Sequence, residues 1–419
     1  MDPWCRDICY NGCAEAPTSP GTRGTRLVRS TPLSYVQVTP SLQNEIRKFG
    51  RFDAGKCLNC GTCTITCDLS GDSASFPRRP IQFALIGLKD IVHGSLEPWL
   101  CHDCGDCSTK CPQQAEPRES LGTLRRYLIA QYDWTGLSAK IMRSRAWAAG
   151  SLVFTGLLFL LLAVLYHSRV VGLSLAELTG TPMKMDHMFG TITWFTLVVI
   201  ILPFLILLSH AFRMYKFTIG RKGDAPIPLS LFLSEGKTFL LHLFTQTGMR
   251  KCPEPERKAR WWKHLLLASG CMLMLAILVF ALRWFQTDGI YPITHPQRWL
   301  GYVATALLLF GSGDILLGRI LHKGEIHKRS DAGDYTLPAL LFMTAASGIA
   351  VHILRYLGLE MATHYSYAVH LAIAVPMLVV EMPFGRWSHM IYRPLALYFQ
   401  AVMEKASCRE TGKEELEAA

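Results

Sequence analysis

Two short runs of the 419-residue sequence each hold four cysteines at the spacing C-x2-C-x2-C-x3-C. Two-cluster ferredoxins use this spacing to ligate two [4Fe–4S] clusters, and the fourth cysteine of each run reaches across to the other cluster. The pattern therefore predicts two clusters that pass single electrons. The predicted ligands are Cys57, Cys60, Cys63 and Cys111 for one cluster, and Cys101, Cys104, Cys107 and Cys67 for the other.

A structural zinc site is the alternative interpretation of these cysteines. Zinc ligands usually come as separated C-x2-C pairs, whereas here four thiols fall within the eleven residues from Cys57 to Cys67. The spacing thus favours clusters. His102 lies inside the second run and is interpreted as a surface residue that tunes the cluster by hydrogen bonding, not as a ligand.

The elements that position these cysteines are predicted to be helices. Leu, Ile, Phe and Tyr recur with helical spacing in residues 41–50, 80–93 and 120–132, and no sustained alternation of apolar and polar residues indicates a sheet. The cysteine runs themselves are expected on loops and short turns. We therefore predict an α-helical ferredoxin domain over residues 35–140.

Residues 1–34 are polar and rich in turn-forming residues. They contain no apolar stretch of the kind found in a cleavable secretory signal, so the domain that follows is expected to stay in the cytoplasm. Cys5, Cys9 and Cys13 would share one helical face, but no fourth ligand lies nearby. The segment is predicted to be a flexible extension without an assigned role for its cysteines.

After Arg145 the sequence becomes strongly apolar, and the mean hydropathy of the whole chain is +0.21. A helix of about 20 apolar residues can cross a bilayer. Because this sequence contains several such stretches, it is not expected to be an ordinary cytosolic enzyme. We expect an all-α fold in which a six-span membrane domain over 141–400 follows the ferredoxin domain and precedes a cytoplasmic tail over 401–419. The predicted spans are about 146–166, 188–209, 265–282, 299–318, 336–355 and 366–388.

The net charge of +11 is interpreted as a consequence of basic cytoplasmic loops rather than as a sign of nucleic-acid binding. Lys and Arg are concentrated in the 211–263 and 322–335 loops, whereas 285–298 and 357–365 hold at most one. Basic loops stay in the cytoplasm by the positive-inside rule. The ferredoxin domain and both termini are therefore expected on the cytoplasmic side of the inner membrane.

Histidines at the ends of the predicted spans are candidate haem ligands, because bis-histidine coordination needs two imidazoles at one membrane depth. His370 and His389 are 19 residues apart on the sixth predicted helix, about 28 Å along its axis, which suits two b haems and not one. The predicted pairs are His264 with His389 for an inner haem, and His187 with His370 for an outer one. The alternative ligands are His210, His352 and His295.

Two acidic residues, Asp314 and Glu381, fall inside predicted spans. Ionisable groups at membrane depth are costly and often functional. They are interpreted either as proton carriers for a quinone or as buried hydrogen-bonded structure.

Residues 40–400 also resemble the membrane-bound C subunit of quinone-interacting membrane-bound oxidoreductase (Qmo) complexes. That protein is a fusion of parts similar to the C and E subunits of heterodisulfide reductase. The last helix resembles the cytochrome b (gamma) subunit of respiratory nitrate reductases, where a histidine pair at nearly this spacing ligates two b haems. Besides the cysteine runs and His370, the resemblance is carried by FTQTGMRKCP (244–253), RWWKH (260–264), HPQRWLG (295–301) and MPFGRWSHMIY (382–392).

The resemblance implies a subunit that passes electrons between membrane quinone, two b haems, two [4Fe–4S] clusters and two flavin and iron–sulfur subunits similar to heterodisulfide reductase A. It further implies adenylylsulfate reductase as a partner in dissimilatory sulfur metabolism. One departure concerns the haems: the nitrate reductase proteins carry both partner histidines on a second helix, whereas here Met274 stands where the second would follow His264.

Two alternatives remain open. One alternative to the Qmo-type subunit is the membrane subunit of another heterodisulfide-reductase-like complex, linked to a heterodisulfide or to sulfite reductase. The other is a haem-free anchor or transporter with a ferredoxin domain. The first alternative shares the electron-transfer role. The second predicts no haem.

Overall fold

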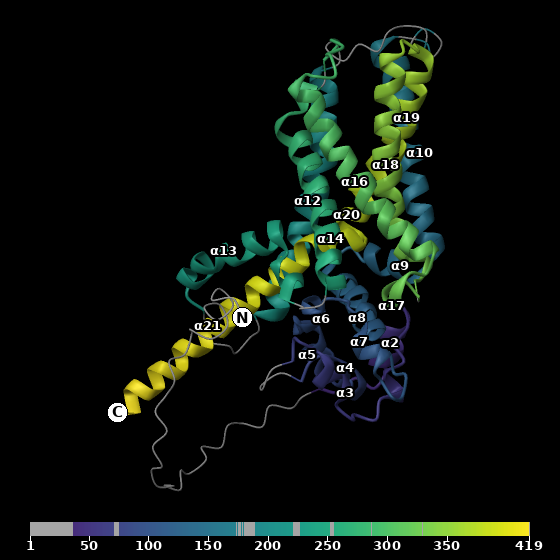
Figure 1. Cartoon of the computed structure of the whole chain (residues 1–419). Coiled ribbons are helices and arrows are strands. Elements are labelled where there is room, and N and C mark those ends of the chain that lie inside the picture. The colour runs from purple at the N-terminus through teal and green to yellow at the C-terminus, as the bar shows by residue number, and fades with distance from the viewer. Residues whose placement is uncertain are drawn as a thin grey trace.

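The computed structural model describes residues 37–70, 75–172, 189–220, 227–251, 255–285, 287–328 and 330–418, together with three isolated positions between 172 and 189. All regular elements within these residues are helices, which confirms the predicted all-α class. Short helices form a base, and long helices rise from it (Figure 1).

The base is built by the first part of the described chain. Its core includes Leu42, Ile46, Phe52 and Leu121, which are fully or almost fully buried. Helices are present at each of the segments predicted at 41–50, 80–93 and 120–132, but the middle segment is divided into two helices at Gly87, whose φ is 87°. The elements are α2 (Leu42–Arg47), η1 (Ala54–Lys56), α3 (Thr62–Thr66), α4 (Arg78–Ile86), α5 (Lys89–Gly94), α6 (Glu97–Leu100), α7 (Asp106–Thr109), α8 (Pro117–Tyr132) and α9 (Leu137–Arg143).

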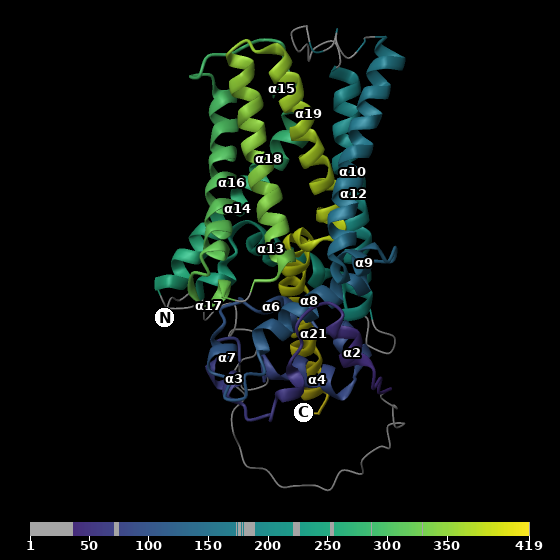
Figure 2. The ribbon, with the colours of Figure 1, turned by 90° about the vertical axis from the view of Figure 1, so that its right-hand side faces the viewer.

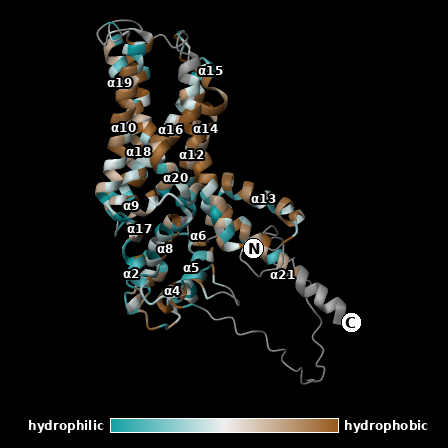
Figure 3. Cartoon of the chain, turned by 180° about the vertical axis from the view of Figure 1, so that it is seen from behind, coloured by the Kyte–Doolittle hydropathy of each residue, from teal (hydrophilic) through white to brown (hydrophobic). Residues whose placement is uncertain are grey.

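Six helical segments are long and apolar enough to cross a membrane, as predicted: Arg145–Val170, Thr193–Thr218, Lys258–Phe280, Pro296–Ile320, Ala332–Tyr356 and Glu360–Phe384. Their apolar surfaces form a continuous hydrophobic zone above the polar base (Figure 3). The elements are α10 (Arg145–Tyr166) with η2 (His167–Val171), α12 (Phe189–Thr218), α14 (Pro255–Phe280), α16 (Pro296–Ile320), α18 (Ala332–Tyr356) and α19 (Glu360–Pro376) with its continuation described next. The chain is therefore a multi-pass membrane protein by the length and composition of its helices.

The sixth span differs from the single straight helix expected over 366–388. After α19 the chain passes through a π-helical turn, η4 (Met377–Glu381), and a short α20 (Met382–Phe384). Gly385 then adopts an extended conformation with φ −99° and ψ −163°, which ends the helix. Pro376 and Pro383 explain the irregularity, because a proline removes a backbone donor and kinks a helix.

The break moves His389 off the spanning helix. A short turn, η5 (Arg386–Ser388), leads into α21 (His389–Ala418), so His370 and His389 lie on two different helices. The inference that they share one helix is wrong, and the 28 Å separation derived from it does not apply. Residues 401–419, expected as a tail, continue α21 to Ala418.

Helix α13 (Leu229–Thr245), which is not one of the six candidate membrane spans, extends sideways with α21 at the level where the spans meet the base (Figure 1). The Tyr398 hydroxyl donates to the Phe232 carbonyl at 2.9 Å, and Lys405 pairs with Glu235. These contacts hold the two helices together. The remaining short elements are η3 (Thr247–Lys251), α15 (Leu282–Phe285) and α17 (Gly324–His327).

Aromatic rings join the base to the spans. Tyr392 of α21 is fully buried, and its ring lies 5.2 Å from that of Trp99 and 5.3 Å from that of Tyr132. Tyr132 in turn lies 6.2 Å from Phe217 of α12. Because such pairs bury large apolar surfaces, the base packs firmly beneath the spans (Figure 2).

Candidate functional site

The two cysteine runs fold into loops with the same backbone conformation. Asn59 and Asp103, each two residues after the first cysteine of its run, both have φ of 57°. Gly61 and Gly105, which follow the second cysteines, have φ of 84° and 94°, a region that glycine adopts without steric cost. These left-handed positions curl each loop around its first sulfur.

Backbone N–H groups in these loops donate to sulfur. Three such bonds, with N···Sγ distances of 3.3 to 3.4 Å, join Asn59 to Cys57, Asp103 to Cys101 and Ala115 to Cys111. Hydrogen bonds to thiolate sulfur stabilise its negative charge and tune the potential of a bound cluster. The donor set and its backbone support therefore fit a [4Fe–4S] group.

One cavity brings the fourth cysteine of the first run to the first three of the second run. It is lined by Cys67, Cys101, Cys104 and Cys107. Burial, together with the neighbouring thiolates of Cys101 and Cys104, raises the pKa of Cys67 to about 12. Protein groups alone thus disfavour thiolates here, and a bound metal group would be needed to stabilise them.

The remaining four cysteines form a second group at the surface of the base. Burial raises the pKa of the Cys63 thiol, and three neighbouring thiolates raise it further, those of Cys57, Cys60 and Cys111. Cys60 is exposed. The adjacent side chains of Leu58 and Ile65 are 71% and 89% exposed. This group therefore faces outward, whereas Cys101 and Cys107 of the other group are buried.

Among the residues with described positions, no three His, Cys, Asp or Glu side chains form a group close enough to hold a single metal ion. In a cubane each thiolate binds a different iron, so its four ligands need not converge on one point.

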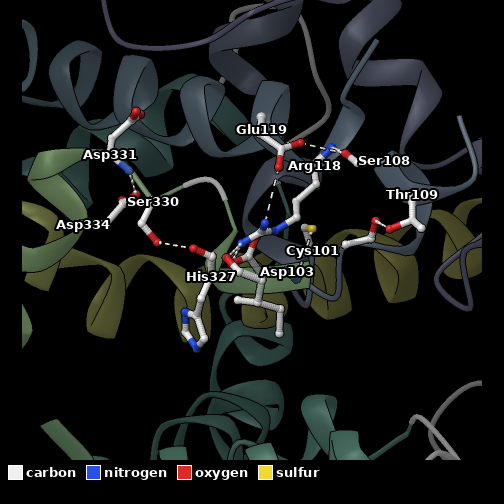
Figure 4. Close-up of polar contacts among 12 residues, drawn as sticks. Cys101, Asp103, Ser108, Thr109, Arg118, Glu119, His327, Ser330, Asp331 and Asp334 are labelled. Carbon is white, nitrogen blue, oxygen red and sulfur yellow. Dashed lines mark hydrogen bonds and ion pairs between the residues drawn. The ribbon is translucent and has the colours of Figure 1, made fainter. Parts of the chain in front are cut away.

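A charged network fixes the second cysteine loop against the membrane helices (Figure 4). Arg118 Nε lies 2.9 Å from Asp103 Oδ1, and Arg118 also donates to the Ile326 carbonyl at 3.0 Å. Although burial opposes it, the Arg118 and Arg125 guanidinium groups hold the pKa of Asp103 well below its usual range. Arg118 therefore links the loop between α16 and α18 to Asp103, which lies between two predicted cluster ligands.

The predicted inner haem ligands lie together. The ring centroids of His264 on α14 and His389 on α21 are 6.4 Å apart, with the rings inclined at 62°. Metal–imidazole bonds of about 2 Å on opposite sides of one metal place the centroids about 6 Å apart. The separation therefore suits an iron between the two rings.

In both rings, Nδ1 forms a hydrogen bond with an oxygen atom. His264 Nδ1 donates to Gln246 Oε1 at 2.5 Å, and His389 Nδ1 donates to the Arg386 carbonyl at 2.7 Å. Burial lowers the pKa of His389, which keeps its ring neutral near pH 7. The Nε2 of each neutral ring is then the basic nitrogen, as in metal-ligating histidines whose other N–H is hydrogen-bonded.

A cavity surrounds this pair, between α13, α14, α18 and α21. Its volume is about 110 Å³, and it is partly open to the surroundings. Sequence reasoning missed three of its polar residues, His242, Gln246 and Arg393, and it interpreted a fourth, His102, as a surface residue beside the cluster. His242 and Gln246 are four residues apart at the end of α13. Gln246 lies in the 244–253 segment that carries part of the family resemblance, but that segment assigned it no role.

The predicted outer pair is described only in part. His370 on α19 lies with its Nδ1 3.0 Å from Ser347 Oγ, and its predicted partner His187 lies outside the described residues. The alternative ligands have other contacts. His352 lies 2.7 Å from the Tyr302 hydroxyl, His295 stacks on Tyr291 at 4.3 Å, and His210 lies 3.2 Å from Asp133.

The two acidic candidates have different surroundings. Asp314 pairs with Lys263 at 2.7 Å, and both side chains are partly exposed. Glu381 is buried where the sixth span breaks, and its Oε1 accepts the Arg386 N–H at 3.1 Å. The interpretation as buried hydrogen-bonded structure thus suits Glu381, whereas Asp314 belongs to a partly exposed ion pair.

Comparison with known proteins gives relatives for part of the chain. It is 27% identical over 100 residues to a protein of Archaeoglobus profundus described as like the C subunit of heterodisulfide reductase, covering 24% of this chain and 53% of that one. It is 29% identical over 97 residues to the second iron–sulfur C subunit of the CoB–CoM heterodisulfide reductase of Methanocaldococcus jannaschii, covering 21% and 52%. The corresponding iron–sulfur protein of Methanopyrus kandleri is 43% identical over 58 residues, covering 14% and 30%.

Two further findings complete the comparison. Residues 233–410 match the family described as Citrate utilization protein B (CitB). No solved structure matches the chain significantly. The chain spans about half the length of the first curated relatives it matches. Its relatives are thus iron–sulfur electron-transfer proteins of the heterodisulfide reductase C type, which are components of oxidoreductase complexes.

Proposed function

We propose that this chain is the membrane electron-transfer subunit of a quinone-dependent oxidoreductase complex. The observation that supports it best is the arrangement of three predicted sites: a group of four cysteines with Cys60 exposed, a second group of four with Cys101 and Cys107 buried, and a cavity with the His264–His389 pair. Bound clusters and haem supply one-electron chemistry at such sites. Together they form a wire from the surface of the base into the membrane.

The proposed assignments follow the predicted ligand sets. Residues 35–140 are assigned to the ferredoxin domain, and 141–400 to the membrane domain. Cys57, Cys60, Cys63 and Cys111 are assigned to the exposed cluster, and Cys101, Cys104, Cys107 and Cys67 to the buried one. The inner haem is assigned to His264 with His389, and the outer haem to His370 with His187.

Each part of the chain has a distinct task in this proposal. The loop N–H groups stabilise thiolate charge, and the apolar helices fix the depth of the imidazoles. The exposed Leu58 and Ile65 flank the outer cluster site and suit contact with a soluble flavin and iron–sulfur partner. With the basic loops in the cytoplasm, that partner would dock on the cytoplasmic side.

The finer assignment is to a Qmo-type complex, with two subunits similar to heterodisulfide reductase A and with adenylylsulfate reductase. The motif resemblance supports it. The names of the relatives equally suit another heterodisulfide-reductase-like complex. The neighbouring genes distinguish the two, because flavin-containing subunits similar to heterodisulfide reductase A beside this gene favour the first.

A spectroscopic experiment tests the proposal. Purified complex is expected to give a b-type α-band in the dithionite-reduced minus oxidised spectrum, and [4Fe–4S] signals by electron paramagnetic resonance (EPR). Menaquinone or ubiquinone analogues should oxidise the reduced haem. Cluster signals without the α-band would instead identify a haem-free anchor, and absence of cluster signals would overturn the proposal.

Gln246 provides a finer test of the inner haem. Its side-chain oxygen accepts from His264 Nδ1, and such an acceptor makes the imidazole more basic. Gln246→Leu is therefore expected to weaken haem retention by about 10-fold and to raise the midpoint potential, because a less basic ligand stabilises ferric iron less. Potentiometric titration of the α-band measures both.

Gln400 is a matched control for this change. It lies on α21 away from the cavity and bonds to Glu404 at 2.8 Å. Gln400→Leu should leave the haem potential unchanged. An unchanged potential and haem content in Gln246→Leu would contradict the assigned role of Gln246.

A further inference from the structure

One histidine lies in the wall between the two cofactor-candidate cavities. His102 lines the cavity of Cys67, Cys101, Cys104 and Cys107, and it also lines the cavity of His264 and His389. On the side of the histidine cavity, a Cβ atom added at Gly248 would lie 3.8 Å from His102 Nε2 and 4.0 Å from His242 Cε1. The imidazole thus reaches from the cysteine loop to the η3 turn that closes the histidine cavity.

The backbone on both sides of His102 is held by arginines. Arg125 donates to the Cys101 carbonyl at 3.0 Å, and Arg260 lies 3.4 Å from the Asp103 carbonyl. Arg118 adds its ion pair with the Asp103 side chain. Three cations from two helices therefore restrain the two residues that flank His102, which limits the positions open to its ring.

Helix α14 connects the same loop to the haem-candidate pair. Arg260, which contacts the loop, and His264, which faces His389, are four residues apart on α14. Residues at this spacing are neighbours on one helical face, about one turn or 5.4 Å apart along the axis. Helix α14 thus fixes the position of the cysteine loop relative to the His264–His389 pair.

We propose that His102 is the contact through which the buried cluster site and the His264–His389 site exchange electrons. This inference rests on the proposed function and adds to it the order of the wire: the group with Cys67 lies next to the membrane site, and the group with Cys60 is the outer entry. One electron moves in the step, from the reduced iron–sulfur centre to ferric iron. No bond forms or breaks, and no proton is transferred.

The test compares two variants, His102→Leu and His102→Gln, in the purified complex. The complex is reduced at the clusters with a fast low-potential donor, and haem reduction is followed by stopped-flow absorbance. Loss of the imidazole in His102→Leu is expected to slow haem reduction by about 10-fold, with cluster EPR intensity, haem content and both midpoint potentials within error of wild type. The Gln variant, which keeps a polar group of similar reach, should slow it less.

His322 serves as a matched control, because it is exposed on the loop after α16 and lines neither cavity. His322→Leu should keep the wild-type rate. A wild-type rate in His102→Leu overturns the proposal. Loss of the cluster signal in both His102 variants also overturns it, because His102 would then serve cluster assembly. Absence of the α-band in the wild-type complex is a different result, which refutes the proposed function itself.

Discussion

Replacing either His264 or His389 with alanine is expected to remove the same single haem. The two imidazoles line one cavity, with 6.4 Å between their ring centroids. A bis-histidine haem that loses one axial ligand loses most of its affinity. Haem extracted per protein should fall by about half in each single variant and no further in the double variant.

The control and the outer haem sharpen this test. His370→Ala should remove the other haem, so that its combination with His389→Ala leaves none. His322→Ala, at an exposed histidine, should retain both haems. If His264→Ala and His389→Ala lose different haems, or if both variants keep two, the inner pair is wrongly assigned.

Replacing Cys67 with serine is expected to abolish the EPR signal of the buried cluster, although Cys67 belongs to the first cysteine run. Its neighbours in the cavity are the first three cysteines of the second run, Cys101, Cys104 and Cys107. Cys67→Ser and Cys107→Ser should therefore lose the same signal and about half of the cluster iron. Cys111→Ser and Cys60→Ser should lose the other signal.

Cys408→Ser is the matched control, because this cysteine lies on α21 and lines neither cofactor-candidate cavity. It should retain both clusters. The crossed assignment fails if Cys67→Ser removes the signal that Cys60→Ser removes. Iron analysis and EPR of the same samples separate the loss of one cluster from the loss of both.

The fold class was predictable because it depends on local patterns. Helical spacing in the base and six apolar stretches each specify a helix without knowledge of its neighbours. The sixth span was predicted less well. It was expected to continue to residue 388, but Pro376, Pro383 and the extended Gly385 interrupt it, and α21 begins at His389.

The cysteine groups depend on local sequence spacing, whereas the histidine cavity depends on contacts between distant segments. The crossing of Cys67 and Cys111 between runs follows from a spacing rule, and the two loops fold alike because both repeat their cysteines and one glycine at the same positions. Gln246 and His264 are 18 residues apart, and His102 approaches Gly248 from a distant part of the chain. No periodicity encodes such contacts.

The sequence by itself determined which residue types are present for electron transfer and how many helices can enter a membrane, because ligand spacing and apolar length are local properties. The tertiary structure alone decided that His264 and His389 meet although the helix break separates His389 from the sixth span. It also placed His102 in a wall shared by two cavities. These results depend on the packing of α8, α13, α14 and α21, which arises from contacts between distant segments.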